Sequence, residues 1–232
     1  TLYFPERLAD DLENIKTYPL TVLEAPSGFG KTTALEEFFS KKYFKNINIY
    51  KQTFFSQNTE EYWQRFCQVL AETDPICADA LKGFKAPNGE NFSEICDYLR
   101  DLECLNETYI FLDNLSGAAE GIDMFLSALS HHSAKKLHIA AAVQSAAAKN
   151  SLRFKNGGRA YFVGAAELAF SAEDCLEYFS SAGILLTGSE LKKLVEITDG
   201  WIFAVHLQLL FYSKNKRFEK DIVNALIGNA FF

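Results

Sequence analysis

Up to residue 165, the chain alternates between short apolar runs and longer amphipathic stretches. Runs typical of buried strands occupy 20–23, 45–54, 108–112, 137–143 and 159–163. Apolar side chains recur at helical spacing in 8–15, 34–39, 60–72, 92–105 and 116–132. The alanines of 137–143 would suit a helix equally, and 74–91, rich in proline and glycine, is predicted to form turns. Strands that alternate with helices predict an α/β fold, with a mostly parallel sheet flanked by helices.

The pattern changes after Leu168, where only helical signals remain. A capping-box-like sequence from Ser171 to Asp174 predicts the start of a helix. Further helices are predicted over 190–197, 201–212 and 218–227. We therefore expect a sheet domain over 1–165 and a small helical domain over 166–232, with a ligand bound between them.

The stretch from Leu20 to Thr33, LTVLEAPSGFGKTT, joins a predicted strand to a predicted helix through a glycine-bearing loop. Strand, glycine loop, Lys-Thr and helix is the layout of a phosphate-binding P-loop. Glycines let backbone N–H groups close round phosphate oxygens, and the helix turns its positive end toward the same anion. Lys31 is placed to reach the phosphates, and the Thr32 hydroxyl to ligate Mg²⁺. The expected nucleotide-binding residues of this loop are Pro26, Ser27, Gly28, Phe29, Gly30, Lys31, Thr32 and Thr33.

A second motif is the apolar run TYIFL, 108–112, which ends at Asp113. A buried strand that ends in an acid is typical of a Walker B segment, whose carboxylate emerges beside the P-loop to hold Mg²⁺. Lys31 and Asp113 are therefore the expected catalytic residues, and Thr32 and Asp113 the expected magnesium site. The next residue, Asn114, cannot act as the base that polarises an attacking water.

Composition narrows the functional classes. The 232 residues are 48% apolar and 14% aromatic, which is typical of a globular chain with a real core. A net charge of −7 argues against a surface that binds duplex DNA. The five cysteines form no C-x-x-C pair and the four histidines lack zinc-ligand spacing, so we expect reduced core cysteines, a cytoplasmic protein and no zinc site. We see no secretory signal and no membrane span, and the start at Thr1 suggests a piece of a longer protein.

Four segments together carry a resemblance to a known family: APSGFGKTT (25–33), YIFLDN (109–114), AELAFSAED (166–174) and TDGW (198–201). In this order and spacing they resemble the nucleotide-binding region of STAND-class P-loop ATPases, most closely that of the MalT-like, LuxR-family transcriptional regulators.

The resemblance implies an ATP/ADP-binding, Mg²⁺-dependent signal-transduction switch with slow hydrolysis, which self-associates when ATP is bound. DNA would be bound only by a C-terminal domain that this chain does not include. Trp201 falls on the family's Gly-Trp position near the nucleotide, although core packing explains a tryptophan there equally well.

Three positions depart from that family. Asn114 replaces a second acid, Gln144 replaces an arginine at the end of the fourth strand, and alanines fill 146–148. Glutamine is neutral and shorter than arginine, so it would not sense the γ-phosphate as arginine does, and with Asn114 and Gln144 together we expect weak ATP hydrolysis or none. Two other functions stay open: a nucleotide-binding scaffold without switching, and a P-loop kinase or ATPase enzyme. The enzyme would need arginines near the phosphates, for which Arg153 and Arg159 are the only candidates.

Overall fold

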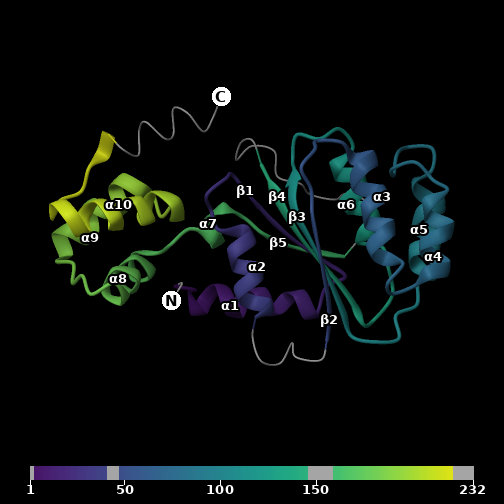
Figure 1. Cartoon of the computed structure of the whole chain (residues 1–232), viewed down its shortest axis with the longest axis horizontal. Helices are drawn as coiled ribbons and strands as arrows, with labels where there is room; N and C mark the ends of the chain where they lie inside the picture. The colour runs from purple at the N-terminus through teal and green to yellow at the C-terminus, as the bar shows by residue number, and fades with distance from the viewer. Residues whose placement is uncertain (1–2, 41–46, 146–158, 222–232) are drawn as a thin grey trace.

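A single parallel sheet forms the centre of the molecule. The computed structural model describes residues 3–40, 47–145 and 159–221, and Figure 1 shows the arrangement of the elements. The five strands lie in the order β2-β3-β4-β1-β5, with every neighbouring pair parallel. Their bounds are β1 Leu20–Ala25, β2 Asn48–Thr53, β3 Thr108–Ser116, β4 Leu137–Gln144 and β5 Ala160–Val163. The predicted α/β sheet is confirmed, and the alanine-rich segment at 137–143 is a strand.

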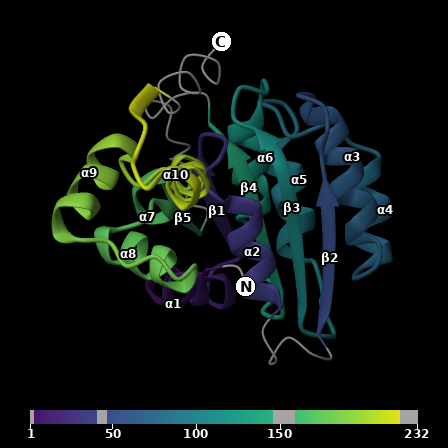
Figure 2. The same cartoon turned by 60° about the vertical axis from the view of Figure 1, so that its left-hand side comes forward.

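Helices cover both faces of the sheet (Figure 2). One face carries α1 Glu6–Leu12, the short 3-10 helix η1 Glu13–Lys16 and α2 Lys31–Phe39; the other carries α3 Thr59–Leu70, α4 Pro75–Lys82, α5 Phe92–Arg100 and α6 Ile122–Leu129. Successive strand residues point to opposite faces. Along β3, Tyr109 and Phe111 pack with α2, whereas Ile110 and Leu112 pack with the α3–α6 layer. The same alternation puts Asp113 on the α2 face, at the carboxyl end of the strand.

A helical region follows the sheet, with a core of its own. It begins after the short α7 Ala165–Leu168 and contains α8 Ala172–Ser181, α9 Gly188–Thr198 and α10 Ile202–Asn215. Its buried residues include Phe170, Cys175, Phe179, Leu194 and Val205. Figure 1 shows it at the opposite end of the molecule from α3–α6. Most of the helix predicted over 218–227 lies outside the described residues.

Two stretches differ from the sequence predictions. The segment 74–91, predicted to form turns, contains α4, because Pro75 occupies its first turn and the Asp74 side chain accepts a hydrogen bond from the Cys77 N–H. The helix predicted over 116–132 is shorter, Ile122–Leu129. The strand before it continues past Asp113, with an irregularity in its pairing where Asn114 takes a left-handed backbone with φ 61°.

Two further predictions concern the cysteines and the membrane. Cys67, Cys77, Cys96 and Cys175 are buried, Cys104 is half-buried, and all five are free thiols, as expected of core cysteines. Among the described residues, none of the helices combines the length and the apolar character needed to cross a bilayer.

Candidate functional site

The P-loop is a tight turn between the end of β1 and the start of α2. Its two glycines, Gly28 and Gly30, adopt left-handed backbones with φ of 82° and 73°, a conformation that costs other residues about 1–2 kcal/mol. No side chain caps the N-terminus of α2, since Gly30 stands at the capping position. The first backbone N–H groups of the helix therefore face the loop, where they can bind an anion.

Lys31 lies folded against its own loop. Its Nζ donates hydrogen bonds to the carbonyl oxygens of Ala25, at 2.7 Å, and Pro26, at 2.9 Å. Burial lowers the pKa of Lys31 to about 8, against the opposing attraction of the Asp113 carboxylate. This desolvated cation would be stabilised by an anionic ligand in the loop.

Thr32 and Asp113 meet as the sequence predicts. The Thr32 hydroxyl donates to Oδ1 of Asp113 at 2.7 Å, and Asp113 is only 5% exposed. A hydroxyl and a carboxylate are oxygen ligands of the kind that Mg²⁺ prefers, with phosphate and water completing its shell. Among the described residues, no group of three or more His, Cys, Asp or Glu side chains is placed to hold a metal ion, so an ion here would depend on such outside oxygens. The donor set therefore fits magnesium that arrives with a phosphate ligand.

These groups line one polar cavity of about 240 Å³. Its lining residues are Ser27, Gly28, Gly30, Lys31, Thr32, Thr33, Asp113, Asn114, Ala142 and Gln144. Two expected loop residues stand outside it. Pro26 takes part through the carbonyl that accepts from Lys31, and Phe29 packs against the core beneath α1 and α2.

A second, apolar cavity of about 210 Å³ adjoins the first and shares Gly30 and Thr33 with it. The rest of its lining is Tyr3, Phe4, Pro5, Leu8, Ala34, Phe170, Tyr178, Ile202 and His206. Its polar edge is a pair: the Tyr178 hydroxyl lies 2.6 Å from Nδ1 of His206. The N-terminal residues stood out in the sequence as possible contacts to a nucleotide base. Phe170 lies in the AELAFSAED segment but was assigned no role there; Tyr178 and His206 belong to no motif, and sequence reasoning missed them.

Trp201 lies on the P-loop rather than in the core of the helical region. Its Nε1 donates to the carbonyl of Ser27 at 3.1 Å, and the Phe203 N–H donates to the carbonyl of Gly28 at 3.1 Å. The approach is close, since a Cβ at Gly28 would stand 2.6 Å from Nε1 of Trp201. The start of α10 therefore covers the loop that would hold phosphate.

Few of the groups that speed hydrolysis in ATPases lie around the polar cavity in the described part of the chain. Among the described residues, Asp113 is the only carboxylate that lines the polar cavity, and none of the arginines in those ranges lines it. The Asn114 amide donates to the carbonyl of Phe54 at 2.7 Å, which fixes its side chain. The backbone N–H of Arg159 donates to the carbonyl of Ser130, and Arg159 is not among the residues that line the cavity. Arg153 and 146–148 lie outside the described residues.

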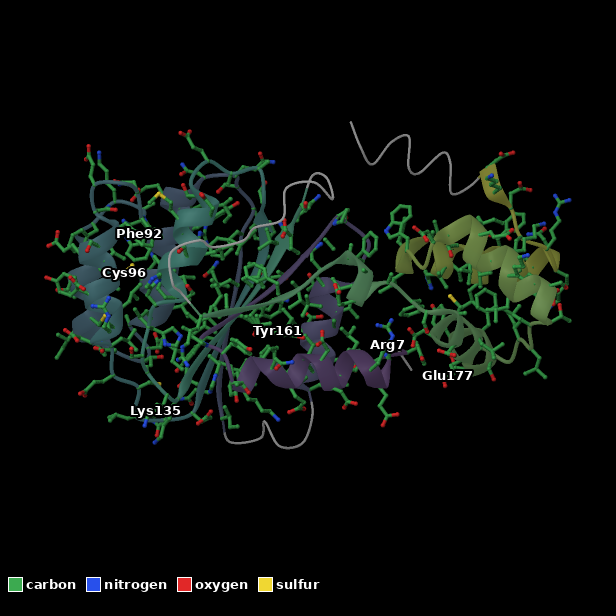
Figure 3. All side chains as sticks on the ribbon, turned by 180° about the vertical axis from the view of Figure 1, so that it is seen from behind. Arg7, Phe92, Cys96, Lys135, Tyr161 and Glu177 are labelled. Carbon is green, nitrogen blue, oxygen red and sulfur yellow. The ribbon has the colours of Figure 1, made fainter. Side chains whose placement is uncertain are left out.

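Arg7 connects α1 to the segment that leads into the helical region. Its guanidinium donates to Asp174, at 2.6 and 2.9 Å, and to the backbone carbonyls of Glu167, at 2.7 Å, and Ala169. Figure 3 shows Arg7 at the N-terminal end of α1, near Glu177 of α8. The Tyr3 hydroxyl donates to the carboxylates of Asp174 and Glu177, at 3.1 and 2.9 Å. The N-terminal residues and the helical region thus share one polar junction beside the apolar cavity.

Comparison with known proteins gives structural likeness without close relatives in sequence. No protein-family model matches the chain, and no curated protein matches it. A signal transduction ATPase with numerous domains (STAND) and a tetratricopeptide-repeat sensor, from Pyrococcus horikoshii, is similar in structure over 86% of this chain and 29% of its own, with a TM-score of 0.54 and 16% identity. A Walker-type ATPase of Pyrococcus abyssi is similar over 98% of this chain and 74% of its own, with a TM-score of 0.55 and 16% identity. The chain therefore has the fold of the P-loop ATPases, STAND proteins included.

Proposed function

We propose that this chain binds an adenine nucleotide, ATP or ADP, with Mg²⁺. The observation that carries the proposal is the junction of two cavities of opposite character at Gly30 and Thr33. A nucleotide has the same two halves, a charged phosphate chain and a flat, largely apolar base. Lys31 and the backbone of the P-loop would hold the phosphates, and the aromatic side chains of the second cavity would hold the base.

Bound magnesium would supply charge neutralisation for the phosphates, and Thr32 and Asp113 would hold it. The protein groups would act by position. Lys31 would leave the carbonyls of Ala25 and Pro26 for phosphate oxygens, and the α2 N–H groups would face the same oxygens. Asn114 offers no base for an attacking water, so we expect slow hydrolysis or none.

The contact of Trp201 and Phe203 with the P-loop supports a switch. Because phosphate would bind to the same loop that the start of α10 contacts at Ser27 and Gly28, nucleotide and helical region would be coupled through this loop. We propose that the sheet domain of 1–165 binds the nucleotide and that the domain of 166–232 reports its state. The setting would be a cytoplasmic, LuxR-type transcriptional regulator that self-associates with ATP bound and contacts DNA through another domain.

One specific observation favours a second function, a nucleotide-binding scaffold that does not switch. Asn114 and Gln144 line the polar cavity where the resemblance implies an acid and an arginine. Without them, ATP and ADP would be held by nearly the same contacts, and a ligand that binds both states equally shifts neither.

The test is nucleotide content and affinity. The protein would be denatured and any released nucleotide identified by chromatography, and ADP and GDP would then be titrated into nucleotide-free protein by calorimetry. We expect ADP to bind, and Lys31→Ala to weaken it at least about tenfold, since a charged hydrogen bond is worth about 1.5–3 kcal/mol. Lys82→Ala, an exposed lysine on α4, is the matched control. Failure to bind ADP would refute the proposal, whether or not GDP binds.

A further test separates the switch from the scaffold. Acrylamide quenching of Trp201 would be measured in two complexes, one with ADP bound and one with a non-hydrolysable ATP analogue bound, and the two results compared. The switch predicts different exposure of Trp201 in the two complexes, and equal quenching would favour the scaffold. Steady-state turnover near that of a metabolic ATPase would contradict the expected slow hydrolysis.

A further inference from the structure

Lys51 of β2 belongs to no motif, yet it lies beside the proposed magnesium site. The register of the sheet pairs Lys51 with Phe111 and Thr53 with Asp113. Lys51 therefore lies on the α2 face of the sheet, two residues before Thr53, which pairs with Asp113. Its Nζ is 3.3 Å from Oδ2 of Asp113 and 5.0 Å from the centre of the Phe111 ring.

The two oxygens of Asp113 have different partners. Oδ1 accepts the Thr32 hydroxyl at 2.7 Å, and Oδ2 faces the Lys51 ammonium. The Asp113 side chain is only 7% exposed, so water screens this pair less than it screens a surface pair. The acid that would support Mg²⁺ thus already has a fixed cation beside it.

Glu36 of α2 holds Lys51 in this place. Its Oε1 is 2.6 Å from the Lys51 ammonium, and its side chain is 56% exposed. By itself the Lys51–Glu36 contact is a surface ion pair, which contributes little to stability. The contact with the buried Asp113 is the one with consequences for a ligand.

We propose that Lys51 is a built-in counter-cation of Asp113 that makes nucleotide binding by this protein weakly dependent on magnesium. The inference rests on the proposed nucleotide site. Mg²⁺ held near Asp113 must share the carboxylate with an ammonium group, and two cations a few ångströms apart repel each other. Asp113 therefore attracts the ion less strongly than an acid without such a neighbour. Lys51 is a positioning residue here, because it acts through Asp113.

The experiment measures ADP affinity by calorimetry in EDTA and in saturating magnesium chloride, and takes the ratio of the two dissociation constants. For the wild type we expect the two dissociation constants to agree within about threefold. Lys51→Met keeps an unbranched side chain and removes the charge, so the ratio should rise at least about tenfold, as a unit charge at short range warrants. Lys51→Arg keeps the charge and should retain the wild-type ratio.

A matched control is Lys16→Met, whose lysine pairs with Glu13 on η1, away from the P-loop. It should leave the ratio unchanged. Thermal unfolding checks that each variant folds, and Lys51→Gln replaces Lys51→Met if the latter does not. Equal ratios in the wild type and the neutral variant, with ADP bound by both, would overturn the role of Lys51 alone. Failure of the wild type to bind ADP in either buffer would overturn the nucleotide site as well.

Discussion

Replacing Gly28 with alanine should push the start of α10 off the P-loop. The new methyl group would meet Nε1 of Trp201 at 2.6 Å and Cβ of Phe203 at 2.9 Å, both far inside van der Waals contact. Two hydrogen bonds cross this contact, from Trp201 to Ser27 and from Phe203 to Gly28, each at 3.1 Å. The helix cannot keep them once it moves to make room.

The expected cost has two parts. Alanine in a left-handed backbone costs about 1–2 kcal/mol, and two lost hydrogen bonds add about 1 kcal/mol each. The free energy of unfolding should therefore fall by about 3–4 kcal/mol. Gly183 provides a matched control, since its φ of 76° is similar and no atom lies within 4 Å of the added Cβ. Gly183→Ala should lose only the first part.

Urea unfolding measures the difference in free energy of unfolding between Gly28→Ala and Gly183→Ala, which we expect to be about 2 kcal/mol. Acrylamide quenching gives the location, because Trp63 is fully buried and the quencher reaches Trp201 preferentially. Quenching should increase in Gly28→Ala and stay unchanged in Gly183→Ala. Equal losses of stability in both variants, with Trp201 quenched as in the wild type, would refute the close contact between α10 and the loop.

Three further predictions concern charge. Burial lowers the pKa of Lys31 to about 8 and a bound phosphate would raise it, so ADP affinity should fall as pH rises above 8, which calorimetry at pH 7 and 9 checks. Burial also lowers the pKa of His132 to about 4, so as pH falls this imidazole takes up a proton in the unfolded chain before it does in the folded one. Stability should then fall by up to about 3 kcal/mol from pH 6.5 to pH 4 in urea titrations, and His132→Gln should flatten that slope. Arg7→Met should leave the nearly buried Asp174 without its cation and open the segment before α8 to low chymotrypsin, which cuts after aromatic residues such as Phe170, whereas Arg65→Met on α3 should not.

The sequence predicted the central elements well because their signals are local. The strand, the glycines and Lys31 lie within one short stretch, and the required order of strand, loop and helix leaves little freedom. Asp113 was predicted because its apolar run ends in an acid and follows a P-loop with helices between, which is the order of a Walker B segment. The helix α4 was missed because Pro75, which is favoured in a first helical turn, also marks turns.

The parts that sequence reasoning missed depend on contacts between distant segments. Alternation along β2 predicts that Lys51 faces the same side as Thr53, but only the register with β3 brings it to Asp113. Tyr178 and His206 are ordinary residues of two helices until the helical region packs beside the P-loop. No spacing rule connects such residues, because the chain between them sets their distance only after it has folded.

The junction of Arg7 with Asp174 also has a consequence for biosynthesis. The two residues are 167 positions apart, so at ordinary elongation rates roughly ten to thirty seconds separate their emergence from the ribosome. During that interval the apolar faces of α1 and β1 await β4 and β5, which pair with β1 from late in the chain. Arg7 of α1 therefore meets its carboxylate partner, Asp174, only when α8 has been made. Nascent chains should depend on chaperones until then.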